Sequence, residues 1–138
     1  MLDRARYRCE YCHIEGWELQ VDHIVPVSER QRGPSSVLPP ADLDHLANLA
    51  AACAHCNRFK GDHVAGPSLL YGGVHRLFNP RGDRWDAHFT WSADFRRVLP
   101  LDAIGDATIQ RLHLNARAFR RQRELLRRDA ESGGAPWP

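Results

Sequence analysis

The chain has 138 residues, of which 43% are hydrophobic and 26% are charged. This length suits one globular domain, and the composition excludes a disordered, collagenous or coiled-coil chain. No apolar run approaches the roughly 18 residues of a membrane-spanning helix, and the N-terminal residues carry charged side chains where a signal peptide would be apolar. We therefore expect a cytoplasmic protein with no membrane partner.

The net charge of +2 is unevenly distributed along the chain. Residues 1–66 contain seven basic and nine acidic side chains, whereas residues 67–138 contain twelve basic and eight acidic ones. All but one of the 19 basic residues are arginine, whose planar guanidinium pairs bidentately with phosphate. The second half therefore suits a polyanionic partner, although a biased base composition of the genome would give the same excess of arginine.

The N-terminal part predicts a helical turn, a strand and a long loop. Residues 2–8 suit one or two turns of helix. Residues 19–25 are rich in β-branched side chains and partly alternate between apolar and polar, which predicts a strand that Pro26 ends. Prolines, a glycine and serines in residues 26–44 indicate an irregular surface loop.

The pattern then predicts a second strand and a helix. Residues 48–52 form a short apolar run that suits a strand, and residues 54–60 suit a short helix capped by Gly61. Residues 62–73 contain several glycines and a proline, which indicate a loop around the core.

The second half predicts a hairpin followed by helices. Residues 74–78 and 88–91 alternate between apolar and polar side chains, so we expect them to pair across residues 79–83. A helical pattern begins at Asp106, and Asn115 is a candidate N-cap for the last helix. Six arginines crowd this last helix: Arg117, Arg120, Arg121, Arg123, Arg127 and Arg128.

The four cysteines form two Cys-x-x-Cys pairs, Cys9 with Cys12 and Cys53 with Cys56. Two such pairs supply the four thiolates of a tetrahedral Zn²⁺ site. The interval between the pairs is longer than in the common zinc ribbons, which predicts a sizeable structure between them. Disulfides or free thiols are the alternative, and the absence of an export signal argues against a disulfide framework.

The first pair also fits a second motif. Cys9-Glu10-Tyr11-Cys12-His13 has the form of a c-type haem attachment site. The second pair is followed by Asn57 in place of histidine and would have no role in a haem protein. A structural zinc held by all four cysteines is therefore the preferred interpretation, and a visible spectrum would identify bound haem.

Four segments in this order resemble the HNH endonuclease family, also called ββα-metal or His-Me finger nucleases, in the branch with two Cys-x-x-Cys knuckles. The segments are Arg8-Cys9-Glu10-Tyr11-Cys12, Val21-Asp22-His23-Ile24-Val25-Pro26, Asn48-Leu49 and Cys53-Ala54-His55-Cys56-Asn57-Arg58-Phe59-Lys60-Gly61. Each segment alone is a weak signal, but the four together with both knuckles are specific.

The resemblance implies an α+β fold with a small zinc-stabilised ββα-metal core in residues 1–66. Residues 67–138 would then be a C-terminal extension, with a hairpin and an Arg-rich terminal helix, that packs on the core. The implied activity is metal-dependent hydrolysis of phosphodiester bonds in double-stranded DNA. The implied cofactors are structural Zn²⁺ and catalytic Mg²⁺ or Mn²⁺.

The resemblance also implies roles for single residues. His23 matches the general base, and Asn48 matches the residue that fixes the loop and orients the His23 ring. Asp22 and Asn57 match the ligands of the catalytic ion, with Asn57 standing where many members have histidine. The Gly-Gly that customarily follows the Asp-His strand is missing. Nucleic-acid contacts are expected from Arg58, Lys60, Arg117, Arg120 and Arg121.

The same residues make chemical sense without the resemblance. Phosphodiester hydrolysis needs a base that takes a proton from water and a cation that neutralises charge on the phosphate. Histidine accepts protons near neutral pH, and an Asp and an Asn oxygen leave open positions of the kind that Mg²⁺ fills with water and phosphate. Neighbouring residues of a strand face opposite sides, so Asp22 and His23 reach one point only where the strand ends or bends. The alternative function is a four-cysteine zinc module that binds nucleic acid without cutting it, for which Asp22, His23 and Asn57 are not required.

Overall fold

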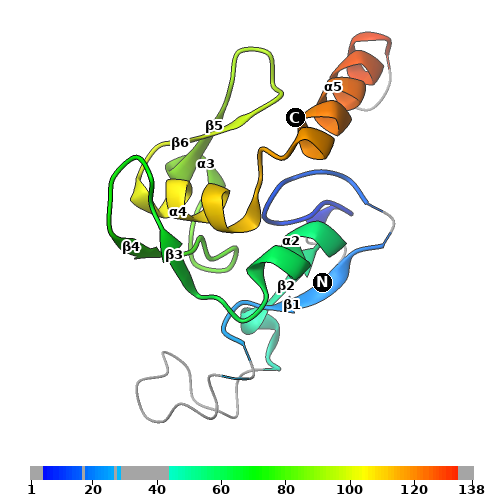
Figure 1. Ribbon diagram of the computed structural model, residues 1–138. Coiled ribbons are helices and arrows are strands. Elements are labelled where there is room, and N and C mark those ends of the chain that lie inside the picture. The colour runs from blue at the N-terminus through cyan, green and yellow to red at the C-terminus, as the bar shows by residue number, and fades with distance from the viewer. Residues whose placement is uncertain (1–4, 17, 27, 29–43, 134–138) are drawn as a thin grey trace.

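The computed structural model describes residues 5–16, 18–26, 28 and 44–133 (Figure 1). Of the predicted helical turns over residues 2–8, residues 5–8 are described: Ala5 is helical, Arg6 and Tyr7 form a turn, and Arg8 bridges Glu15. The predicted loop over residues 26–44 lies largely outside the described range. Within it, three two-stranded antiparallel sheets combine with four α-helices and one 3-10 helix. The predicted α+β class is confirmed. None of the helices in the described part of the chain is long and apolar enough to cross a membrane.

The first sheet and its helix form the ββα unit. Strand β1 (Gln20–His23) pairs with β2 (Leu49–Ala52), with Gln20 opposite Ala52 and His23 opposite Leu49. The 3-10 helix η3 (Leu46–Asn48) leads into β2, and helix α2 (Ala54–Lys60) follows one residue after β2 ends. Helix α2 ends at Gly61, as predicted, with a positive φ of 49° that a residue without Cβ adopts at little cost.

The predicted hairpin of the second half is wrong in its pairing. Strand β4 (Val74–Arg76) pairs with β3 (Ala65–Pro67), while β5 (Phe89–Trp91) pairs with β6 (Val98–Pro100). Between these two hairpins lie a turn over residues 79–83 and the short helix α3 (Trp85–His88). Alternation identified β4 and β5, but it carries no information about which strand each pairs with. The prediction of a loop over residues 62–73 is wrong at β3, and β6 was not predicted.

Helix α4 (Ala103–Leu112) and helix α5 (Arg117–Glu131) complete the fold. The N-cap of α5 is Ala116, so the prediction of Asn115 as the cap is wrong. The Asn115 side chain instead accepts from the Val98 backbone N–H at 2.9 Å and donates to the Val98 carbonyl at 2.8 Å. Asn115 therefore holds β6 beside the start of α5, because its amide satisfies both backbone groups of one strand residue.

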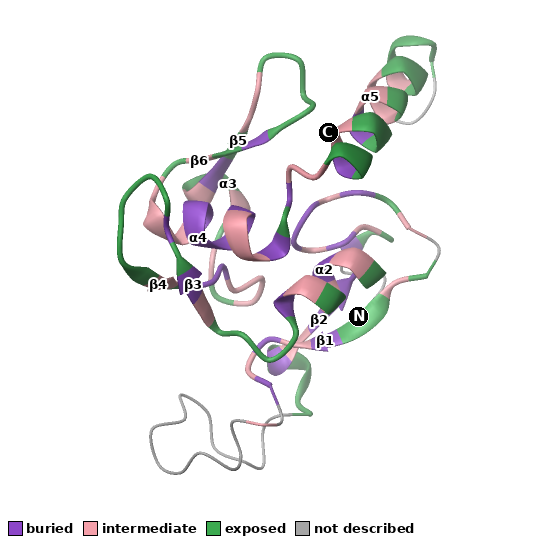
Figure 2. Cartoon of the chain, in the orientation of Figure 1, coloured by how far each residue is buried: buried purple, intermediate pink, exposed green. Residues whose placement is uncertain are grey.

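One hydrophobic core spans both halves of the described chain (Figure 2). It includes Tyr11, Ile24 and Ala50 from the first half, and Phe89 and Phe119 from the second. The division into a core of residues 1–66 and an extension of residues 67–138 that packs on it stays a prediction.

Candidate metal centre and catalytic cleft

The two Cys-x-x-Cys pairs come together in space. The sulfur atoms of Cys9, Cys12, Cys53 and Cys56 all lie within 4.8 Å of one another, and the Cys12 and Cys53 sulfurs are 3.9 Å apart. Four sulfurs at about 2.3 Å from a tetrahedral Zn²⁺ would lie about 3.8 Å apart, so the cluster fits this ion. Among the described residues it is the only group of three or more His, Cys, Asp or Glu side chains placed to hold a metal.

Local structure positions each pair. In the first knuckle the Cys9 N–H donates to the Ile14 carbonyl at 3.0 Å, and the Cys9 carbonyl accepts from the His13 N–H at 2.8 Å. In the second knuckle Cys53 is the N-cap of α2, and its sulfur accepts from the Cys56 N–H at 3.4 Å. Hydrogen bonds from Cys12 and Cys56 lower the pKa of Cys53, which favours the thiolate that metal binding needs.

His13 follows the first knuckle directly but is not among the described residues placed to hold the ion. Burial lowers the pKa of His13 to about 4, and the nearby positive charges of Arg8 and Arg123 act in the same direction. Its ring stacks on Trp85 with centroids 4.6 Å apart. We therefore regard His13 as a packed, neutral residue at pH 7.

Strand β1 directs Asp22 into the interior, where its side chain is 3% exposed. One carboxylate oxygen accepts from the Tyr11 hydroxyl at 2.6 Å, and the other accepts from the Lys60 ammonium at 3.1 Å. Burial raises the pKa of Asp22, against the opposing influence of Lys60 and Tyr11.

Lys60 lies in a different place from the one expected of a phosphate contact. Its side chain is 1% exposed, and its ammonium donates to the Asp22 carboxylate and to the His23 carbonyl, the latter at 2.8 Å. No phosphate reaches this ammonium in the arrangement described. Lys60 instead ties the end of α2 to the end of β1.

His23 lies beside an acid that sequence reasoning missed. Its Nε2 is 3.0 Å from a carboxylate oxygen of Asp44, whose side chain is largely exposed. A carboxylate against one ring nitrogen fixes the orientation and tautomer of an imidazole. No motif marks Asp44, because its contact with His23 depends on how the chain returns from the long loop to η3.

Asn48 fixes the backbone next to His23. Its amide donates to the Val25 carbonyl and its side-chain oxygen accepts from the Val25 N–H, both at 2.9 Å. The Asn48 carbonyl also accepts from the Ile24 N–H at 2.9 Å. These contacts end β1 directly after His23 and turn the chain.

Asn57 and His23 share a cleft of about 360 Å³ at the end of β1. The cleft is lined by Val21, Asp22, His23, Pro26, Ser28, Asn57, Gly61 and Asp62. The Asn57 amide donates to the Gln20 side-chain oxygen at 2.7 Å, so its own oxygen is the atom suited to a cation.

Asp22 and Asn57, the residues predicted to hold the catalytic ion, both line this cleft. A carboxylate has about four acceptor positions, of which Tyr11 and Lys60 take two on Asp22. The remaining positions and the Asn57 oxygen match the few protein oxygens with which Mg²⁺ is usually held. The neighbouring Lys60 ammonium repels any such ion and limits its affinity.

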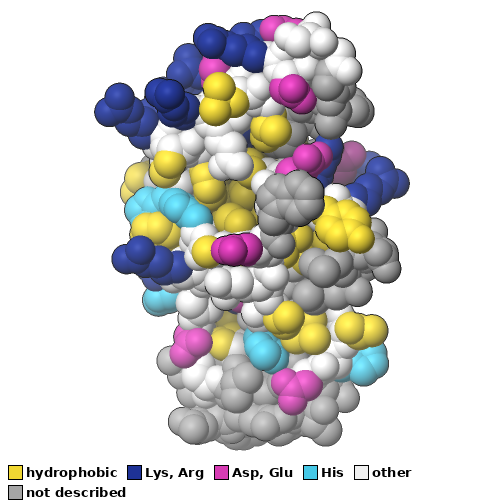
Figure 3. Space-filling model, turned by 90° about the vertical axis from the view of Figure 1, so that its right-hand side faces the viewer, with side chains coloured by type: hydrophobic (Ala, Val, Ile, Leu, Met, Phe, Trp, Pro, Cys, Tyr) yellow, Lys and Arg dark blue, Asp and Glu magenta, His cyan; other side chains and the backbone are white. Residues whose placement is uncertain are grey.

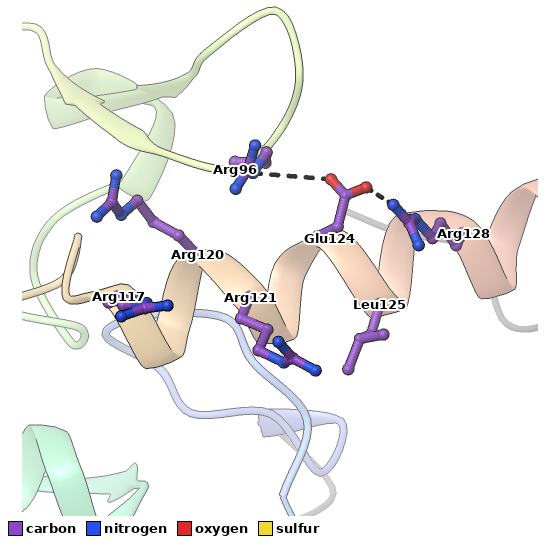
Figure 4. Close-up of a pocket in the computed structure, with 7 residues that line it drawn as sticks. All are labelled: Arg96, Arg117, Arg120, Arg121, Glu124, Leu125 and Arg128. Carbon is purple, nitrogen blue, oxygen red and sulfur yellow. Dashed lines mark hydrogen bonds and ion pairs between the residues drawn. The ribbon is translucent and has the colours of Figure 1, made fainter.

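The expected nucleic-acid residues fall into two groups. Arg58 is exposed on α2, while Arg117, Arg120 and Arg121 lie on α5. The α5 arginines line a shallow groove of about 390 Å³ together with Arg96, Glu124, Leu125 and Arg128 (Figure 4). On the face drawn in Figure 3, most of the Lys and Arg side chains lie in the upper half, where α5 is.

Fold and site together describe a small α+β module with a candidate four-cysteine metal centre beside a cleft that contains a histidine. The family model of HNH endonuclease matches residues 9–63, which confirms the resemblance drawn from the sequence motifs. The match covers less than half of the chain and includes all four cysteines and the cleft residues Asp22, His23 and Asn57. This segment is thus similar to the HNH endonuclease family, and the match suggests a nuclease-type function. Searches of curated proteins and of solved structures gave no significant match.

Proposed function

We propose that the chain is a metal-dependent endonuclease that hydrolyses phosphodiester bonds in double-stranded DNA. The observation that carries this proposal is the cleft at the end of β1, which His23, Asp22 and Asn57 line together within the segment that matches the HNH model. Binding alone would not require a histidine aligned by an acid at this position. In this proposal the zinc is structural and joins the two knuckles.

His23 acts as the general base in this proposal. Its imidazole takes a proton from a water molecule in the cleft, and the water oxygen bonds to phosphorus while the bond to the leaving oxygen breaks. The leaving oxygen then receives a proton from solvent. Asp44 aligns the His23 ring, and Asn48 holds the backbone of Val25 close to His23. A divalent cation held by Asp22 and Asn57 would supply neutralisation of the phosphate charge.

A plasmid-nicking assay with Mg²⁺ or Mn²⁺ tests this proposal. We expect His23→Ala to lower the cleavage rate about 10²- to 10⁴-fold, because a positioned base contributes on this order, with zinc content and DNA binding retained. His63→Ala is the matched control, since His63 is exposed just beyond α2 and does not line the cleft. Cleavage by His23→Ala at the parental rate would favour the zinc module that binds nucleic acid without cutting it.

Asn57→Ala tests the ion. Removal of one neutral oxygen should lower the rate at limiting Mg²⁺, and an excess of Mn²⁺ should restore part of it, whereas no cation concentration should restore His23→Ala. Asn57 is a better probe than Asp22, because Asp22→Ala would also leave Lys60 buried without its carboxylate.

We propose that the α5 groove holds the DNA backbone. Arg96 comes from the loop between β5 and β6, so the groove gathers arginines from two elements. Glu124 neutralises part of this charge through Arg128 at 2.8 Å and Arg96 at 3.7 Å. Arg117, Arg120 and Arg121 are outside these two ion pairs and are therefore the arginines proposed to contact phosphate.

The salt dependence of DNA affinity tests the groove. Each phosphate contact adds about 0.9 to the slope of log K against log salt concentration, so Arg120→Ala with Arg121→Ala should flatten the slope by about 1 to 2. An unchanged slope would mean that α5 is only a structural helix, whose charges are solvated.

A further inference from the structure

A zinc ion with four thiolates carries a net double negative charge. Cys9, Cys12 and Cys56 are fully buried, so most of this charge would lie out of contact with water. A buried charge is costly unless cationic or hydrogen-bonding groups compensate it, and the groups around the ligands usually do so. A compensating group is therefore expected next to the cysteine cluster.

Lys60 and Arg123 are the buried cationic side chains of the described core. Lys60 is already paired with Asp22, so Arg123 on α5 is the candidate for the compensating group. Its side chain is fully buried, and its guanidinium lies 5.7 Å from the Phe119 ring centroid. The Phe119 ring lies 4.2 Å from the ring of His55, which stands between Cys53 and Cys56 in the second knuckle. Arg123 is thus packed against the residues that cover this knuckle.

A second path of contacts joins Arg123 to the first knuckle. The guanidinium lies 5.3 Å from the centroid of Trp91, and Trp91 lies 5.0 Å from Trp85. The Trp85 indole N–H donates to the carbonyl of Tyr11, which stands between Cys9 and Cys12. Arg123 therefore lies between the aromatic groups that contact both pairs of cysteines.

The hydrogen bonds of Arg123 are incomplete. Nη1 donates to the Arg96 carbonyl at 3.2 Å and to the Asn115 side-chain oxygen at 3.4 Å. Nε and Nη2 are buried without a partner in the described structure. No described carboxylate lies within ion-pair distance of this guanidinium. Burial lowers the pKa of Arg123, while the negative charges of Cys12 and Cys56 oppose that effect. A buried arginine with two unused N–H groups and nearby thiolates needs an anion of the kind that a metal-bound cysteine cluster provides.

We propose that Arg123 is the counter-ion of the zinc and cysteine centre, so that α5 closes the metal site from the C-terminal part of the chain. This assigns two functions to the α5 arginines. Those in the groove face solvent, whereas Arg123 faces the core and stabilises the metal centre. The proposal concerns zinc retention and is independent of nuclease activity.

Zinc affinity of charge variants tests this role. We expect Arg123→Met to lower zinc affinity about 10- to 100-fold, measured by transfer to a chromogenic chelator, since loss of a group that supports metal ligands has effects of this size. Arg123→Lys should retain most of the affinity because it keeps the positive charge. Arg128→Met, on the exposed side of the same helix, should match the parental chain.

A double-mutant comparison separates charge from packing. In a Cys53→His chain the zinc centre would carry one negative charge less, so Arg123→Met should cost less zinc affinity there than in the parental background. An equal cost in both backgrounds would overturn the proposal and leave Arg123 as a packing residue. If Arg123→Met does not fold, Arg123→Lys and Arg123→Gln decide the matter, and equal zinc affinity of these two variants contradicts a counter-ion role.

Discussion

At the scale of single residues, the end of β1 depends on a buried ion pair. The side chains of Asp22 and Lys60 are both almost fully buried, and the Lys60 ammonium also donates a hydrogen bond to the His23 carbonyl. Such pairs contribute little over an apolar pair of the same size, but loss of one partner leaves an uncompensated charge in the interior.

Lys60→Met should therefore lower the free energy of unfolding by about 3 to 5 kcal/mol in urea denaturation of the zinc-loaded chain. Addition of Asp22→Asn should recover a large part of this loss, because the neutral amide needs no counter-charge. Arg58→Met, on the exposed face of the same helix, should change stability by less than about 0.5 kcal/mol. A fully stable Lys60→Met chain would show that Asp22 is neutralised without Lys60, by protonation or by another cation.

Asp106 gives the fold a dependence on pH. Its carboxylate accepts from the Ser68 hydroxyl and the Leu70 N–H, both at 2.8 Å, and from the Gln110 amide at 3.1 Å. Burial alone would raise the pKa of Asp106, but these hydrogen bonds outweigh it and the pKa is lowered. Since the folded state binds the proton less tightly than the unfolded chain, this stabilisation is present above about pH 4 and is lost as the pH falls through the folded pKa.

Asp106→Asn should accordingly cost about 1 to 3 kcal/mol at pH 7, where a charged acceptor is lost. The difference from the parental chain should shrink steadily below about pH 4, as seen in urea denaturation at a series of pH values. Asp129→Asn, at an exposed position, serves as control. A difference that stays constant down to the acid limit would exclude the carboxylate charge as its cause.

At the scale of elements, the sequence predicted the features that residue spacing and side-chain type determine. The order of β1, β2 and α2, the Gly61 cap and the meeting of the four cysteines all follow from spacing and side-chain type. The clamp that Asn115 makes on Val98 and the contact of Asp44 with His23 join residues 17 and 21 positions apart, so no local pattern predicts them. The burial of Lys60 was not predicted either, because a lysine at the end of a helix is normally exposed. Here its partners Asp22 and His23 on β1 lie 38 and 37 positions away in the sequence.

The close approach of α4 to α3 is another feature of packing, and it depends on Gly105. A Cβ atom at this position would lie 2.1 Å from the His88 carbonyl oxygen. That oxygen also accepts from the Leu101 N–H at 2.9 Å, so it is not free to move aside.

Gly105→Ala should therefore force the helices apart and lower the free energy of unfolding by at least about 1 to 3 kcal/mol, despite the higher helix propensity of alanine. Gly82→Ala is a suitable comparison, because its nearest contact is an ordinary 3.7 Å and we expect a change within about 0.5 kcal/mol. Equal melting temperatures of the Gly105→Ala and parental chains would refute the close approach.

At the scale of the whole molecule, the metal centre and the hydrophobic core are one body. Cys9, Cys12 and Cys56 belong to the same buried cluster as Leu112 and Phe119. A chain of this size buries a limited apolar area, so a metal ion bound in the core that both halves share would contribute a large share of the folding free energy.

Removal of zinc should consequently unfold both halves in one transition. We expect a strong chelator to abolish amide protection in α2 and in α4 at the same rate, followed by hydrogen exchange and mass spectrometry, while the same chelator saturated with Zn²⁺ should have no effect. Cys53→Ser should give an insoluble or unfolded chain, because three thiolates with one hydroxyl hold the ion poorly. Persistent protection of α4 after the metal is gone would show that the C-terminal part folds independently. A soluble, folded and metal-free Cys53→Ser chain would show that zinc is not required for the fold.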